Sequence, residues 1–230
     1  MQNIKNKFQE IRNSNWKKLF FELIVVFLGV SSGFFLNNWR MEEQEKQVED
    51  KYLAAFLNDV NENIPELKNI IESDSIWLTR VTPKLELIQN ETLSLDSALI
   101  LTSLIASISR LDVHNGTYED ITNSGNLNLI SDFKLKSLIV DYNIVINGVG
   151  FIDDYFYKYF NDFVMPFIFK EFSVLKGEFN NPTVIKSVRF ANVVAGYYSM
   201  VQQRSAAYSD LLDKTYTLRD ELMNYNFSDN

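Results

Sequence analysis

The sequence predicts an all-α protein, with one N-terminal transmembrane helix continuing into an elongated extracytoplasmic helical bundle. Three observations lead to this fold class. Residues 19–36 are apolar apart from Glu22 and two serines. Only eight glycines and four prolines occur in 230 residues, which favours long helices over a turn-rich β fold. No stretch alternates apolar and polar residues with a period of two, so we expect no sheet.

The apolar run is the first element, and its length suits a bilayer. Eighteen helical residues extend about 27 Å, close to the ~30 Å of a hydrocarbon core. No small-residue cleavage site follows the run, so we interpret it as an uncleaved signal anchor. We expect a cytoplasmic basic tail over residues 1–18, a transmembrane helix over 19–39 and an extracytoplasmic α-helical domain over 40–230.

The charge distribution predicts the orientation. Residues 1–18 carry five basic side chains and one acidic one, whereas residues 40–230 carry 17 basic and 28 acidic ones. The positive-inside rule then predicts a single-pass protein with its N-terminus in the cytoplasm and its C-terminal domain outside, which is the periplasm if the membrane is the inner membrane of a Gram-negative bacterium. The acidic body disfavours nucleic acid and anionic lipid as partners. Residues expected at the membrane interface are Lys17, Lys18, Asn38, Trp39 and Arg40.

Several residues within the span are unusual for lipid, and their spacing places them on one side of the helix. We call this set the glycine stripe: Glu22, Val26, Gly29, Gly33 and Asn37. The Gly-x-x-x-Gly pair permits close approach of two helix backbones, which predicts a homo-oligomer; the alternative is chance, since glycine is common in such spans. Glu22 either reaches water and pairs with Lys18 or forms a proton or ion site facing a partner helix.

The later elements follow from prolines and capping residues. We expect the first helix to continue to about residue 78, with a kink or restart near Asn63 because Pro65 lies inside it. Thr82-Pro83 predicts a separate short helix start. Further helices are expected over about 96–109, from Thr117 to a left-handed Gly125, from Asp132 to about 170 with a kink or end at Pro166, and from Pro182 to about 224 with a break near Phe190.

Aromatic residues crowd one segment, with ten Phe or Tyr among the 22 residues from 151 to 172. They cover more than one helical face, so three interpretations stay open: a central helix of the bundle, an oligomer or partner interface, and contact with a membrane surface. The residues expected in aromatic packing or an interface are Tyr155, Phe156, Tyr159, Phe160, Phe163 and Phe167.

Residue types for catalysis or metal binding are scarce. With no cysteine and a single histidine, His114, a thiolate zinc site, a histidine-based zinc site and a catalytic triad are all disfavoured. Residues 147–150 lack the spacing and the lysine of a phosphate loop. Carboxylate pairs such as Asp153-Asp154 are interpreted as solvated helix charges. We therefore expect no cofactor, no metal and no enzymatic activity.

Two blocks resemble an uncharacterised family of single-span bacterial membrane proteins, known only as a domain of unknown function. In the first block a glutamate opens the span, a glycine lies mid-span and Asn-Asn-Trp ends it. The matching residues are Glu22, Gly29, Asn37, Asn38 and Trp39, then Gly116, Thr117, Tyr118, Ser124, Gly125, Leu127, Leu129 and Ile130. Glu119, Asp120 and Phe34-Phe35 depart from the pattern. The resemblance implies a helical, membrane-anchored protein without a known activity.

The sequence thus predicts a membrane-anchored structural or interaction protein that self-associates through the glycine stripe and its helical domain. One alternative is an accessory or stator-like subunit of a larger, ion-driven inner-membrane complex, with Glu22 as its proton or ion site. Another is a helical-bundle sensor that binds a small ligand. The expected partners are the lipid bilayer, further copies of the chain and a larger membrane complex.

Overall fold

The computed structural model describes residues 2–227, with the side chains of Trp16 and of residues 18–227. It divides into two units, residues 2–50 and residues 51–227, and helix α1 (Gln2–Gln89) contributes to both. The chain is helical almost throughout, which confirms the predicted all-α class. The exception is a hairpin of two short antiparallel strands, β1 (Phe172–Ser173) and β2 (Glu178–Phe179), where we had expected no sheet.

The first unit is one uninterrupted helical segment with an exposed apolar surface. Within α1, the most apolar window of 18 residues has a mean hydropathy of 2.2, and none of it is buried. Phe27, Val30 and Phe35, for example, are between 67% and 71% exposed. By length and composition this segment is a candidate membrane span.

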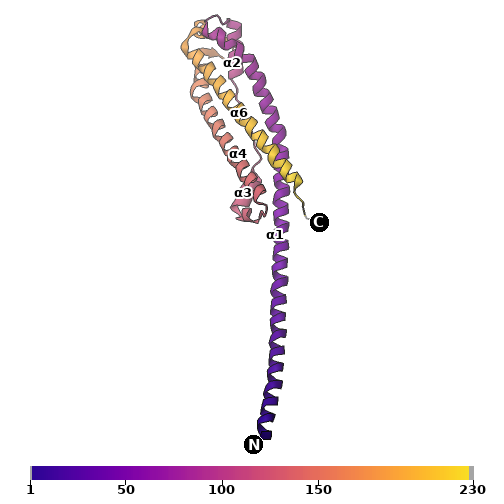
Figure 1. The fold of residues 1–230 in the computed structure, drawn as a ribbon. Helices are drawn as coiled ribbons and strands as arrows, with labels where there is room; N and C mark the ends of the chain where they lie inside the picture. The colour runs from indigo at the N-terminus through magenta and orange to yellow at the C-terminus, as the bar shows by residue number, and fades with distance from the viewer. Residues whose placement is uncertain (1, 228–230) are drawn as a thin grey trace. The chain divides into compact units, whose positions relative to one another are not determined.

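The second unit is a bundle of three long helices. The later part of α1, α4 (Phe133–Tyr159) and α6 (Val188–Asn224) run alongside one another, as Figure 1 shows. At one end lie α3 (Gly116–Asn123) and the 3₁₀ turn η1 (Asn126–Leu129). At the other end lie α2 (Leu95–Ile105), α5 (Met165–Glu171), the hairpin and the 3₁₀ turn η3 (Pro182–Lys186).

Two hydrophobic clusters fill this bundle. Towards the α3 end, α1, α4 and α6 contribute buried aliphatic side chains, among them Leu53, Val60, Leu67, Ile139 and Leu211. Towards the hairpin end the cluster is richer in aromatic rings, among them Phe156, Phe167, Phe190 and Tyr197. The aromatic segment therefore supplies much of the second cluster.

Helix α1 continues through both of its prolines, so the restart expected near Asn63 and the separate helix expected at Thr82-Pro83 were wrong. Pro65 and Pro83 both face solvent, where water can bond the carbonyl groups that each proline leaves without a donor. Ile64 and Leu67 beside the first proline, and Val81 beside the second, are buried. Packing of these neighbours outweighs the local loss of a hydrogen bond.

Other element boundaries differ from the expectation in detail. Gly125 adopts the predicted left-handed conformation, with φ of +75°. The α-helical hydrogen bonding of the long aromatic helix is interrupted by the π turn η2 (Phe160–Val164). This turn lies immediately before α5, whose second residue is Pro166. The last helix begins at Val188, where the Ser187 side chain accepts a hydrogen bond from the Phe190 backbone, so the expected break lies slightly earlier.

A second stretch also has the length and composition of a span. Phe133–Glu171 reaches a mean hydropathy of 1.3 in its most apolar window, of which 22% is buried. In α4 the buried side chains include Leu135, Ile139 and Ile146, which belong to the first core cluster, where α4 packs along α6. The bundle core therefore accounts for part of the apolar composition of this stretch.

Candidate functional site

All five residues of the glycine stripe lie on the exposed surface of α1. A Cβ atom added at Gly29 or Gly33 would meet no atom within 4 Å, so the surface beside both glycines is open. Asn37 donates a hydrogen bond to the Met41 sulfur at 3.6 Å. Within the described part of the chain Glu22 forms no ion pair with Lys18, and its role as a proton or ion site stays a prediction.

The predicted interface residues lie on the same helix. Lys18, Trp39 and Arg40 are exposed, and Asn38 is half-buried. Trp39 exposes 67% of its surface, and its place in an aromatic belt at the membrane interface stays a prediction. The side chain of Lys17 lies outside the described residues.

The aromatic residues singled out from the sequence separate into two groups. Phe156, Phe160 and Phe167 are buried in the hairpin-end cluster, whereas Tyr155 and Phe163 are more than half exposed. Tyr159 is half-buried and contacts α6. Its hydroxyl donates to the α6 carbonyls of Asn192 and Val193 at 3.1 and 3.2 Å. The bundle-core interpretation therefore applies to the three buried rings, and the oligomer-interface and membrane-surface interpretations stay predictions for the exposed ones.

A buried ion pair joins α1 to α6 in the middle of the bundle. Arg204 Nε donates to Asp74 Oδ2 at 2.9 Å, and Nη2 donates to Asp74 Oδ1, so the contact is bidentate. Both side chains are only 4% exposed. The guanidinium group also lies over the Phe156 ring, 4.7 Å from its centroid. Burial lowers the pKa of Arg204, but the hydrogen bonds and charge of Asp74 raise it overall, so the guanidinium stays charged.

A second buried carboxylate lies on α4. Asp153 is 6% exposed, and its Oδ1 accepts a hydrogen bond from the Tyr208 hydroxyl at 2.5 Å. Burial raises the pKa of Asp153, although this hydrogen bond and the charge of Arg204 act in the opposite direction. Burial and the same bond to Asp153 raise the pKa of Tyr208, so the phenol remains the donor. The interpretation of Asp153 as a solvated helix charge was therefore wrong.

The irregular segment between α2 and α3, residues 106–115, is fixed by three long-range contacts, and we call it the clamped segment. Tyr197 donates to the Ser107 carbonyl at 2.6 Å, and Arg204 Nη1 donates to the Ser109 carbonyl at 2.8 Å. Asn63, which is 1% exposed, accepts from the His114 backbone at 2.7 Å and donates to its carbonyl at 2.9 Å. Loops usually carry fewer such contacts, so this segment has one well-defined path.

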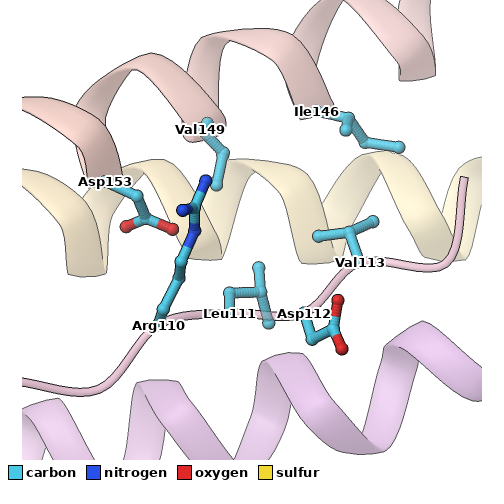
Figure 2. Close-up of a pocket in the computed structure, with 8 residues that line it drawn as sticks. Arg110, Leu111, Asp112, Val113, Ile146, Val149 and Asp153 are labelled. Carbon is cyan, nitrogen blue, oxygen red and sulfur yellow. The ribbon is translucent and has the colours of Figure 1, made fainter.

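The clamped segment and α4 enclose a half-open cleft of about 550 Å³. Its walls combine apolar and charged side chains: Arg110, Leu111, Asp112, Val113, Ile146, Val149, Gly150 and Asp153. Figure 2 shows Arg110 extending from the clamped segment toward Asp153 and Val149 on α4. Arg110 also pairs with the exposed Asp154 at 3.2 Å.

The block that begins at Gly116 packs against α1 beside this region. The hydroxyl of Tyr52 donates to Asp120 at 2.9 Å and lies 3.2 Å from the Ser124 hydroxyl. The Thr117 backbone donates to Asp59 at 3.3 Å, so Thr117 is held by α1 and is not the N-cap that the sequence suggested. The block therefore fixes the end of the clamped segment that leads into α3.

The sequence analysis missed Asp74, Asp153, Arg204 and Tyr208. A signal was present, because each occupies a helical position between buried residues: Asp153 lies three to four residues from Val149 and Phe156. A charged residue on an apolar stripe is seldom left unpaired. Among the described residues, no group of three His, Asp or Glu side chains is placed to hold a metal ion.

Comparisons of the chain with protein-family models, with curated proteins and with solved structures find no match. The resemblance to an uncharacterised single-span family therefore stays a prediction based on the two sequence blocks.

Proposed function

We propose that this chain is a membrane-anchored interaction protein whose copies associate through the glycine stripe. The observation that carries the proposal is the apolar window of α1, in which no residue is buried. Such a surface requires lipid or another protein around it. On that surface two glycines, four residues apart, have open space where a second backbone can approach.

The proposed location follows from the same segment. The excess of basic residues before it supports a cytoplasmic N-terminus, with the second unit outside the cytoplasm, which is the periplasm in a Gram-negative bacterium. A reporter enzyme that is active only outside the cytoplasm, fused to the C-terminus, is expected to be active. Activity of a cytoplasm-specific reporter at that position would contradict this orientation.

The test of association is the mass of the full chain in detergent micelles. Wild-type chain is expected to form an oligomer, and replacement of Gly29 and Gly33 by leucine is expected to reduce its mass to that of the monomer. Ser31→Leu is the matched control, because it adds a leucine about half a turn away, on the opposite side of the helix. A monomeric wild type, or an oligomer that survives the double replacement, would exclude this interface.

A second candidate function, the binding of a small molecule, is favoured by the cleft. The apolar floor is formed by Leu111 and Val149, which are buried, and Asp153 presents a carboxylate whose Oδ2 accepts no hydrogen bond within the described chain. Together Arg110, Asp112, Asp153 and the adjacent Asp154 leave a net charge of −2. We infer a ligand with an ammonium group and a short apolar part.

The two glycines of α4 provide a direct test of the cleft. Gly150 lines the cleft and Gly148 does not, and a Cβ at either position would meet no atom within 4 Å. n-Butylammonium is expected to raise the melting temperature of the wild type and of Gly148→Leu, but not of Gly150→Leu. Butyrate is the oppositely charged control. An equal effect of butyrate, or an unchanged response of Gly150→Leu, would argue against the inferred ligand.

A further inference from the structure

The hairpin presents apolar side chains at its turn, away from the core. Leu175 is fully exposed, at 102%, and Val174 is 64% exposed. The turn is well defined, because the backbone of Gly177 donates to the Ser173 carbonyl at 2.8 Å and has φ of +68°, a conformation that suits glycine. We call residues 173–178 the hairpin tip. Its two aliphatic side chains contribute nothing to the folding of the bundle.

The base of the hairpin is fixed to the core, so the tip is held in one place. The rings of Phe172 and Phe179 meet edge to face at 5.4 Å, and Phe179 also contacts Phe190 at 6.2 Å. Phe179 and Phe190 are both buried. The Asn180 backbone donates to the Glu171 carbonyl at 2.9 Å. A rigid base and an exposed apolar turn suit insertion of the turn into an apolar environment such as a lipid bilayer.

The surroundings of the tip are basic, although the chain as a whole has a net charge of −8. Residues 165–189 contain four basic and two acidic side chains, a net charge of +2. Glu178 lies 3.7 Å from Lys176, and Glu171 lies 3.5 Å from Arg189 and 3.9 Å from Lys170. Lys176 still exposes 73% of its side chain to solvent. Lys186 is exposed, and α2, which packs on η3, adds the single carboxylate of Asp96 at its start.

Two elements beside the hairpin carry further exposed apolar side chains. Phe169 on α5 is 70% exposed, and Val188 at the start of α6 is 75% exposed. The ion pair between Glu171 and Arg189 joins these two elements beside the hairpin. The exposed aliphatic and aromatic groups are thus interspersed with lysines, as in segments that bind at the boundary between headgroups and acyl chains.

The size of the tip distinguishes lipid from protein as the occupant. A stable protein interface covers about 800 Å² on each partner, which a turn of a few residues does not provide. A bilayer needs only a few inserted side chains, with cations at the phosphate groups. We propose that the hairpin tip binds an anionic lipid bilayer, inserting Val174 and Leu175 while Lys176 and Lys186 contact the headgroup phosphates.

The proposal goes beyond self-association and is tested with the full chain in zwitterionic nanodiscs. Added vesicles contain either phosphatidylcholine alone or about 30% phosphatidylglycerol, and their flotation measures binding. We expect the chain to float with the anionic vesicles, less so at high salt, and not with the zwitterionic ones. Because insertion of one leucine changes affinity at least about tenfold, Leu175→Asp should reduce flotation by that factor.

Ile144→Asp is the matched control, because Ile144 is 60% exposed on α4, outside the hairpin end. It should float as the wild type does, and both variants should keep the helical circular dichroism spectrum, since neither side chain is buried. Equal flotation of Leu175→Asp and wild type, or equal binding to both vesicle types, would overturn the proposal. A third result would also overturn the proposal: the wild type does not float with either vesicle type, and Leu175→Asp has a smaller oligomer mass in detergent than the wild type. The hairpin tip would then contact a second copy of the chain and not lipid.

Discussion

The ion pair between Asp74 and Arg204 allows a quantitative prediction of stability. Asp74→Ala removes two charge-assisted hydrogen bonds, each worth about 1.5–3 kcal/mol, and leaves the buried Arg204 side chain, which is 4% exposed, without its carboxylate. Breaking a buried ion pair from one side generally costs about 3–5 kcal/mol, in agreement with that range. We therefore expect the free energy of unfolding to fall by about 3–5 kcal/mol.

The assay is denaturant-induced unfolding of the full chain in detergent, followed by circular dichroism. Replacing both partners, as Asp74→Leu with Arg204→Met, should recover most of the loss, because neither charge of the pair is then left buried without its partner. The Ser109 backbone belongs to an exposed residue and can bond water. Glu221→Ala breaks the more exposed Lys134–Glu221 pair and should cost less than about 1 kcal/mol. A loss below about 1 kcal/mol in Asp74→Ala, or a double variant no more stable than the single one, would refute the reasoning.

Three further predictions concern α4 and α6. Tyr208→Phe should lower the free energy of unfolding by about 1–3 kcal/mol in the same assay, because it removes the donor to buried Asp153. The pKa of Asp153 is raised above its ordinary 3.8, so the folded chain binds this proton more tightly than the unfolded chain. The wild type should therefore become more stable relative to Asp153→Asn as the pH falls toward 3.8, and should lose this advantage as the pH rises through the pKa of Asp153 in the folded chain. A difference in the free energy of unfolding between the two proteins that does not change with pH would contradict the raised pKa of Asp153. Gly196→Ala should lower the free energy of unfolding by about 1–3 kcal/mol, because its Cβ would lie 2.1 Å from the Tyr159 hydroxyl oxygen. Gly148→Ala, whose Cβ would meet open space, should instead raise it by up to about 1 kcal/mol, and thermal unfolding measures both changes.

The helical architecture was readable from the sequence because its signals are local. The long apolar run, the left-handed Gly125 and the scarcity of turn residues each act over a few neighbouring positions. The prolines misled for the same reason: a local rule predicts a break, but burial of Ile64 and Val81 on the other side of α1 maintains the helix.

The buried charges and the cleft could not be predicted in the same way. Asp74 and Arg204 are separated by 130 residues, and Asp153 and Tyr208 by 55. Nothing in the sequence pairs a given carboxylate with a given arginine across such distances. Only the position of each group on an apolar helical stripe distinguishes it from the many solvated charges of this acidic chain.

The clamped segment has a consequence for how the chain is made. Three side chains bind its backbone: Asn63 on α1, and Tyr197 and Arg204 on α6, which lies far along the sequence. Contacts of such long sequence separation form late, after the local helices. During synthesis the apolar side of α1 is therefore not fully buried until α6 has been made. Until then it is an exposed apolar surface that attracts chaperones or promotes aggregation. A nascent chain halted before Val188 would lack the α6 side chains that complete both core clusters, so folding of the bundle depends on residues 188–224.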